Sequence, residues 1–363
     1  MKKLLTTLLS LTLASSLTLG LVACGDKSNG DDGKVTAEQW AAALSKESFA
    51  SCKVKVVQSQ SGLFSLPDGE AKANGTNIET TTYTIAGDRQ YSKTEISVTG
   101  DKAFVDAWNE FASRYGTTEE RYGLKVDDGI YLRYRQFEDD DDDEWTFDVR
   151  SYPLFSSLEA MTQIASVYDS FEYNSAKKGY TVKEDADSAL VQNLTGTVVK
   201  FKNKKLSEVY SERTDVDDGE TYTYVQSFTF TYGTYTVNIP ATTSEYAGTW
   251  ETYQFKAMGA TLGVGDTIPE GAFGEGSPAM EIKADSVTFT FNNDGTASYK
   301  FWEDTGKGAY EDYGGDYFYF YSNDLEEDYD KDQLSFNYAD EHLTFRITYK
   351  GVDVTVTLAK KAA

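Results

Sequence analysis

The feature that most constrains this chain is a succession of alternating polar and apolar runs, separated by turn signals roughly every eight to twelve residues. The runs are rich in threonine and tyrosine, which favour the pleated backbone of a β-strand. Asp294 and Gly295 add a strong hairpin signal, because Asp-Gly tolerates the positive φ angles of a tight turn. The sequence therefore predicts a mainly β protein built from antiparallel strands.

Three segments in the first half of the chain have a helical period instead. Thr36 and Gln39 have the spacing of a capping box at the start of a short helix over residues 36–44. Further helices are expected over residues 101–115 and 153–168, where apolar side chains recur every three or four positions. The first half is thus predicted to be α+β, whereas the second half has no convincing helix.

The length of the chain, 363 residues, exceeds the roughly 100 to 200 of one ordinary domain. With 40% apolar residues it can bury a sizeable core. Around Pro240 the large apolar residues stop, and a new alternating run begins at Tyr246. We therefore expect a first domain over residues 35–241, a linker over 242–245 and a second domain over 246–363.

The N-terminus resembles a bacterial lipoprotein signal. Two lysines precede an apolar run over residues 4–21, which fits a secretory signal or a marginal transmembrane helix. Leu21-Val22-Ala23-Cys24 resembles the lipobox, in which the cysteine thiol receives a diacylglyceryl group before cleavage. The resemblance implies a signal peptide over residues 1–23 and lipidation of Cys24; the alternative is an ordinary signal peptide with an incidental cysteine.

Lipidation would hold the mature protein on a bilayer, because two acyl chains anchor a soluble domain where one lets it leave. Residues 25–34 contain no apolar side chain, so residues 24–34 are predicted to be a flexible tether. We expect a lipid-anchored protein on the extracytoplasmic face of the cell membrane, with the membrane as its partner through Cys24.

Charge and composition exclude several classes of function. Fifty-nine acidic against 34 basic residues give a net charge of -25, which repels nucleic acids and anionic lipid headgroups. One histidine and two cysteines are too few for a structural zinc site or most histidine-dependent triads. We therefore predict no enzyme, no catalytic residue, no metal, no cofactor and no nucleic-acid partner. Cys52 is interpreted as a buried small hydrophobe, with a reactive thiol as the alternative.

The layout of residues 35–241 resembles the lipoprotein-carrier (LolA-like) superfamily. The resemblance depends on the order of helices and strands and on the closing stretches at residues 198–202 and 228–240. It implies a half-open antiparallel sheet wrapped around helices, enclosing a concave apolar cavity. Simple core packing is the alternative role for the side chains that would line this cavity, namely Trp108, Phe111, Met161 and Ile164.

The start of the second domain resembles lipocalin-like barrels, because Gly248-Thr249-Trp250 matches their Gly-X-Trp signature. The resemblance implies a small antiparallel β-barrel or sandwich in which a late-strand basic residue packs over the tryptophan. Arg346 is the only arginine in this domain and is the candidate for that cation-π contact. The glycine-rich residues 259–279 are either a lid over the barrel mouth or a disordered loop.

Three further motifs have competing interpretations. The acidic run over residues 138–144 and the cluster over 324–330 are calcium-attracting tips or, as we favour, solvated loops without a coordination pattern. In the run from residue 317 to 321, two phenylalanines face the core. The three tyrosines on the other face pack on another domain or form a stacking surface for sugars and peptides.

The sequence therefore predicts a non-enzymatic, membrane-anchored binding or carrier protein of the cell envelope, with an apolar or amphipathic ligand such as a lipid. The alternative is a surface interaction protein that binds glycan or protein through exposed tyrosines. An envelope hydrolase is a more distant third candidate, because 59 acidic residues always supply carboxylate pairs.

Overall fold

The computed structural model describes residues 33–67, 71–136, 145–186, 194, 196–217, 219–312, 316–324, 333–349 and 351–362. The expected signal peptide, Cys24, most of the expected tether and the acidic run at 138–144 lie outside these residues. The chain divides into two compact units. Unit 1 holds residues up to Glu120 together with Phe155–Val237, and unit 2 holds Arg121–Leu154 together with Asn238–Ala363.

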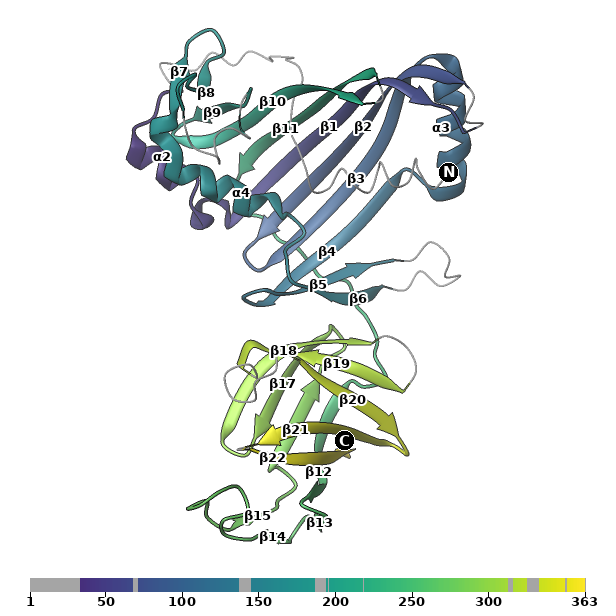
Figure 1. Ribbon diagram of the computed structural model, residues 1–363, viewed down its shortest axis with the longest axis vertical. Coiled ribbons are helices and arrows are strands. Elements are labelled where there is room, and N and C mark those ends of the chain that lie inside the picture. Colours follow the sequence, from purple (N-terminus) through teal and green to yellow (C-terminus); the bar gives the residue numbers. More distant parts are fainter. Residues whose placement is uncertain are drawn as a thin grey trace. The chain divides into compact units, whose positions relative to one another are not determined.

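The first sheet is antiparallel, with the strand order β6-β5-β4-β3-β2-β1-β11-β10-β9-β8-β7 (Figure 1). Alternating Thr, Val and Tyr residues explain its long central strands, because β-branched and aromatic side chains pack well on a pleated surface. Its strands are β1 (Ser51–Ser65), β2 (Lys72–Ala86), β3 (Arg89–Gly100), β4 (Thr118–Asp127), β5 (Ile130–Arg135), β6 (Thr146–Arg150), β7 (Phe171–Asn174), β8 (Gly179–Val182), β9 (Val198–Lys202), β10 (Lys205–Asp217) and β11 (Glu220–Tyr232).

The helices of unit 1 lie where the sequence predicts them. The capping box forms, since Thr36 accepts from the Gln39 backbone and the Gln39 side chain accepts from the Thr36 backbone. In Figure 1, α3 lies at one end of the long strands, and α2 and α4 lie toward the other end. The elements are α2 (Ala37–Ala43), η1 (Lys46–Phe49), α3 (Lys102–Tyr115), α4 (Ser157–Ile164) and η2 (Ala165–Ser170).

The core of unit 1 forms where these helices cover one face of the sheet. Trp40 is fully buried, and its indole nitrogen donates to the Ile164 carbonyl oxygen over 3.0 Å. Cys52, Val54 and Phe230 project from β1 and β11 into the same cluster. Alternation along these strands thus places apolar side chains on the helix-covered face of the sheet, as the sequence pattern predicts.

In unit 2, an antiparallel sheet closes on itself through pairing of β12 with β22, which gives a barrel. The Asp294-Gly295 hairpin predicted from sequence joins β16 to β17. The strands of this sheet are β12 (Gly248–Ala257), β13 (Ala260–Gly263), β16 (Val287–Phe291), β17 (Thr296–Phe301), β18 (Asp304–Asp312), β19 (Tyr317–Tyr321), β20 (Gln333–Ala339), β21 (His342–Tyr349) and β22 (Val352–Lys360). A separate two-stranded sheet pairs β14 (Thr267–Ile268) with β15 (Met280–Glu281).

The structure groups residues differently from the predicted domains. Residues 121–154, which the sequence analysis assigned to the first domain, belong to unit 2, and the division after Val237 falls before Pro240. The reason is packing: Leu132 and Phe147 fill the space beside Gly295, whose φ is +81°. The Tyr134 hydroxyl also donates to the Asp294 carbonyl oxygen over 2.6 Å.

The secondary structure departs from the sequence pattern at several places. The alternating apolar residues of 234–239 predict a strand, but these residues have no regular secondary structure. The pattern also misses β6, β7 and β18. β6 and β7 are short, so their alternation is too brief to detect. In the described part of the chain, no helix is long and apolar enough to cross a membrane.

Candidate functional site

The four side chains expected to line an apolar cavity do not come together. Met161 and Ile164 are buried in the helix-covered core of unit 1. Trp108 and Phe111 lie on α3, with ring centroids 5.3 Å apart, and do not belong to that core cluster. The expectation of a shared cavity is therefore wrong, because α3 and α4 cover different ends of the sheet (Figure 1).

Between the two covered ends, the same face of the sheet is polar. The strand register brings together a set of side chains that we call the polar band. Thr81 and Thr94 are hydrogen bonded over 2.9 Å, and Gln60 donates to the Tyr224 hydroxyl over 3.2 Å. The band consists of Gln58, Gln60, Asn77, Glu79, Thr81, Thr94, Ser211, Arg213, Tyr224 and Gln226, with Ile96 as an apolar neighbour.

Gln60, Thr81 and Ser211 of the band are already buried. An acyl chain placed against the band would offer its polar groups no hydrogen bonds, which is unfavourable. This face therefore does not have the apolar chemistry that the carrier resemblance implies.

The barrel of unit 2 is filled by its own side chains. Seven phenylalanines on alternating strand positions point inward and are almost completely buried; they are Phe289, Phe291, Phe301, Phe318, Phe320, Phe336 and Phe345. Residues 259–279, expected to be a lid or a disordered loop, are packed: Phe273 is buried, with its ring 5.1 Å from that of Tyr349. The described barrel thus resembles a packed core rather than a ligand cavity.

Trp250 is buried, and the cation over its ring is not the arginine expected from the sequence. Its indole nitrogen donates to the Tyr246 carbonyl oxygen over 2.8 Å, and Lys360 lies over its ring at 5.4 Å. Arg346 is exposed, because it alternates with the inward-facing Phe345 and Ile347 on β21. A Cβ at Gly248 would lie 2.8 Å from the Lys360 side chain, so the glycine leaves room for that contact.

The tyrosine row on β19 is divided. Tyr317 is exposed, whereas Tyr321 packs against the cluster formed by the β5 and β6 strands. Phe318 and Phe320 are buried as predicted. Cys52 is also buried, and burial raises the pKa of its thiol to about 11, as expected for the inert interpretation.

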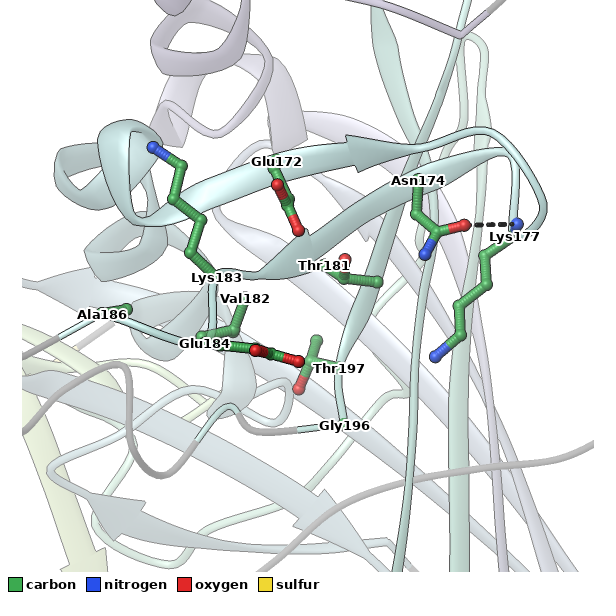
Figure 2. Close-up of a pocket in the computed structure, with 10 residues that line it drawn as sticks. All are labelled: Glu172, Asn174, Lys177, Thr181, Val182, Lys183, Glu184, Ala186, Gly196 and Thr197. Atoms are coloured by element: carbon green, nitrogen blue, oxygen red, sulfur yellow. Dashed lines mark hydrogen bonds between the residues drawn. The ribbon is translucent and has the colours of Figure 1, made fainter.

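A cavity of about 550 Å³ opens on unit 1 beside the β7–β8 hairpin (Figure 2). Glu172 on β7 and Thr181 on β8 are cross-strand partners and line it together. The segment after β8 contributes Glu184, and the residue before β9 contributes Thr197. None of these residues was predicted from sequence, because no motif marks them.

Thr197 is the most informative group in this cavity. Its side chain is 1% exposed, and its hydroxyl oxygen has no hydrogen-bond partner among the described residues. Gly196, which precedes it, has a φ of +85°, and a Cβ there would lie 3.1 Å from the Glu212 carbonyl oxygen. The turn therefore requires glycine and fixes a buried hydroxyl at the cavity wall. A buried hydroxyl without a partner costs about 1 to 3 kcal/mol, so a ligand that bonds to it recovers that energy.

The rest of the cavity is charged in both signs. Glu172 and Glu184 supply carboxylates, and the Lys177 side chain lies on the other side of the cavity in Figure 2. The Asn174 side-chain oxygen accepts from the Ala176 and Lys177 backbone nitrogens, each over 3.1 Å, which orders the hairpin tip. Such an arrangement complements a ligand with an ammonium group and an anionic group.

A second cavity of about 430 Å³ is lined by Glu47, Ser51, Lys205 and Tyr232, among others. Lys205 lies 4.8 Å from the Tyr232 ring centroid, and burial raises the pKa of this phenol. The Tyr232 hydroxyl is also buried without a hydrogen-bond partner among the described residues. Its ring already has this cationic partner and the cavity is smaller, so we regard it as the weaker candidate. Within the described ranges, no group of three or more acidic, histidine or cysteine side chains is arranged to hold a metal ion.

No family model matches the chain, and no curated protein matches it either. Among solved structures, transferrin binding protein B of Haemophilus parasuis, in a mutant form, is similar with 9% identity and a TM-score of 0.17, over 85% of this chain and 75% of that one. Intact Ap-TbpB, with its N and C lobes, has the same identity and TM-score over 85% and 76%. A protein of Nitrosomonas europaea described as an AttH has 11% identity and a TM-score of 0.14 over 94% and 99%. At these TM-scores, neither fold nor function is transferred to this chain.

Proposed function

We propose that this chain is a non-enzymatic binding protein of the cell envelope, which holds a small zwitterionic ligand in the cavity beside the β7–β8 hairpin. The observation that carries the proposal is the buried, unpartnered Thr197 hydroxyl at the wall of a cavity of about 550 Å³. Glu172 and Glu184 would hold the ammonium group of the ligand. Lys177 would face its anionic group.

The polar ligand replaces the apolar one expected from sequence for two reasons. The residues predicted to hold an acyl chain either fill the core of unit 1 or lie apart from it on α3. Another part of the same sheet face is the polar band, whose amides and hydroxyls an acyl chain could not hydrogen bond. Of the features that the carrier resemblance implies, we keep only one, namely that helices cover part of one face of an antiparallel sheet.

The proposal includes attachment to the membrane through Cys24, because the lipobox spacing favours acylation and the tether that follows has no apolar residue. Acylation would place the protein on the extracytoplasmic face of the membrane, where small polar solutes reach it by diffusion. In the Cys24→Ser variant we expect no incorporation of labelled fatty acid, and labelled mutant protein would refute the anchor.

Native mass spectrometry of the full chain, purified from its host in mild detergent, tests the ligand directly. We expect a bound species of low mass that is released in denaturing solvent and replaced when free amino acids or dipeptides are added in excess. A co-purifying acyl lipid in its place would restore the apolar-carrier interpretation. If neither a bound species nor binding from an amino-acid and dipeptide panel is detected, the proposal is wrong.

A further inference from the structure

The first residues that the structure describes are held at one place in unit 1. The Val35 backbone nitrogen donates to the Tyr180 hydroxyl over 2.7 Å, and that hydroxyl donates to the Val35 carbonyl oxygen over 2.9 Å. The Tyr168 hydroxyl donates to the same carbonyl oxygen over 3.1 Å. Val35 is also buried in the core of unit 1. The chain before Val35 therefore leaves the folded body at a fixed point.

This exit point lies beside the β7–β8 hairpin and the end of β9. A Cβ at Gly33 would lie 3.3 Å from the Phe201 carbonyl oxygen and 3.8 Å from the Lys178 carbonyl oxygen. The Lys34 Nζ atom lies 5.1 Å from the ring centroid of Tyr173 on β7. β7, β8 and β9 follow one another at one edge of the sheet (Figure 1). The turn after β7 and the turn after β9 therefore both lie next to the exit point.

Both turns carry exposed lysines, which we call the lysine collar. Lys178 lies in the β7–β8 turn, and Lys202 at the end of β9 pairs with Lys205 at the start of β10. Neither residues 174–178 nor residues 202–205 include an acidic side chain. The collar consists of Lys178, Lys202, Lys204 and Lys205, all exposed.

The acidic residues closest to these turns do not neutralise the collar. Glu208 on β10 pairs with Lys200 over 3.1 Å. Glu172 on β7 faces the proposed ligand cavity. Glu47 and Lys205 line the second cavity together but form no ion pair. Within the described part of unit 1, no collar lysine has a carboxylate partner at ion-pair distance.

The exit point is close in sequence to the proposed lipid anchor. Nine residue steps separate Cys24 from Gly33. A chain of this length spans at most about 32 Å, even when it is fully extended. Acylation of Cys24 would therefore keep the exit point, with the lysine collar beside it, within that distance of the bilayer.

Charge near the bilayer matters more than the charge of the whole chain. The net charge of -25 opposes binding to anionic lipids, but salt screens charges that lie more than about 8 Å from the surface. Lysines held close to an anionic surface are attracted to it. Residues 25–32 contain three aspartates against one lysine, so this attraction comes from the collar rather than from the tether.

We propose that the lysine collar binds the anionic headgroups of the bilayer to which Cys24 attaches the protein, so that this end of unit 1 faces the membrane. The proposal rests on the proposed attachment through Cys24 and is independent of the identity of the ligand. Glu172 and Thr181 of the ligand cavity lie on the same hairpin as part of the collar. The proposed cavity would therefore be held close to the membrane surface.

Energy transfer from a dye on the full-length acylated protein to labelled lipid headgroups tests this orientation. The dye is attached at Ser175→Cys, in the β7–β8 turn, or at Asn109→Cys, on α3 at the other end of the long strands (Figure 1). Cys24 carries the lipid, and burial raises the pKa of the Cys52 thiol to about 11, so neither competes for the dye. On phosphatidylglycerol vesicles we expect stronger transfer from position 175 than from position 109, and high salt should reduce the difference.

A triple variant of the collar tests the lysines themselves. Replacing Lys178, Lys202 and Lys204 by Gln should lower the transfer from position 175 on phosphatidylglycerol vesicles to the level measured on phosphatidylcholine vesicles. Lys177 is left intact because it faces the proposed ligand cavity, so ligand binding should be unchanged. Melting temperatures report whether the variant is folded.

The matched control replaces three exposed lysines outside the collar, Lys55, Lys256 and Lys307, by Gln. It changes the net charge by the same amount and should give the transfer of the wild type. Transfer that does not depend on phosphatidylglycerol, or an equal loss in the two triple variants, would overturn the collar proposal and leave the anchor in place. A wild-type protein without an acyl chain would overturn both the anchor and this orientation.

Discussion

The barrel of unit 2 and the sheet of unit 1 are built from the same kind of alternating strand, but their inward faces have different chemistry. Inside the barrel, phenylalanines such as Phe289 and Phe336 pack with ring centroids 5.0 Å apart. On the helix side of the unit 1 sheet, a core around Trp40 gives way to the amides and hydroxyls of the polar band. Closure of a sheet thus coincides here with a filled aromatic interior, whereas the open sheet carries polar side chains on part of the corresponding face.

This difference supports the placement of the proposed binding site in unit 1. A packed aromatic interior stabilises a barrel but leaves no volume for a ligand, since cores are packed to the density of organic crystals. A buried hydroxyl without a partner, as at Thr197, instead favours a binding site, because leaving it without a hydrogen bond costs free energy that a bound ligand recovers. The following predictions test the contrast, beginning with the largest effect.

Trp250→Ala should lower the free energy of unfolding by about 3 to 5 kcal/mol, because it removes a fully buried indole and its hydrogen bond to Tyr246. Arg346→Met should change it by much less, since Arg346 is exposed and does not lie over the ring. Chemical denaturation of both variants checks this. Equal, small effects would mean that the aromatic interior of the barrel is not its main source of stability.

Raising the pH above 9 should destabilise unit 1 through Cys52. The folded pKa of this thiol is raised from its ordinary 9.0 to about 11, so the neutral thiol is favoured by folding. Its contribution is complete below pH 9 and is lost between pH 9 and about 11, reaching about 2 to 3 kcal/mol. The difference in unfolding free energy between wild type and Cys52→Ala should shift accordingly, and a difference independent of pH would contradict the assigned burial.

Phe147→Ala should destabilise unit 2 by about 2 kcal/mol, because a partly buried ring loses less than a fully buried one. Phe147 packs on Tyr310 with ring centroids 5.4 Å apart and fills the space beside Gly295. Amide exchange should then rise in the β16–β17 hairpin. If only unit 1 amides responded, residues 121–154 would belong with the first domain, as the sequence boundary implied.

Much of this fold is readable from local sequence. The capping box at Thr36 and Gln39 and the Asp294-Gly295 hairpin are determined by neighbours in the chain, and both form as predicted. The inward orientation of Phe318 and Phe320 follows equally from alternation. Such features depend on interactions that a period or a turn motif encodes directly.

Long-range features were not readable in this way. Lys360, rather than Arg346, lies over Trp250 because the register of β12 and β22 brings the end of the chain there. The cavity at Thr197 depends on a glycine turn packing against the distant Glu212 carbonyl, which no motif records. The assignment of 121–154 to unit 2 depends likewise on side-chain packing around Gly295.

A matched pair of buried threonines tests the central claim most directly. Thr252 in the barrel donates to the Val287 carbonyl oxygen over 3.0 Å and accepts from the Val287 backbone nitrogen over 2.8 Å. Thr252→Val should therefore destabilise the protein by about 1 to 3 kcal/mol, because it removes both of these hydrogen bonds. Thr197→Val should instead stabilise the ligand-free protein by about 1 kcal/mol, because it removes a hydroxyl that lacks a partner among the described residues.

The decisive measurement is the stability of ligand-free Thr197→Val alongside its affinity for the zwitterionic species found by mass spectrometry. The account predicts a more stable protein that binds its ligand about tenfold less tightly, the opposite of a folding defect. Loss of stability on Thr197→Val, or unchanged affinity for the ligand, would contradict the assignment of this cavity as the binding site.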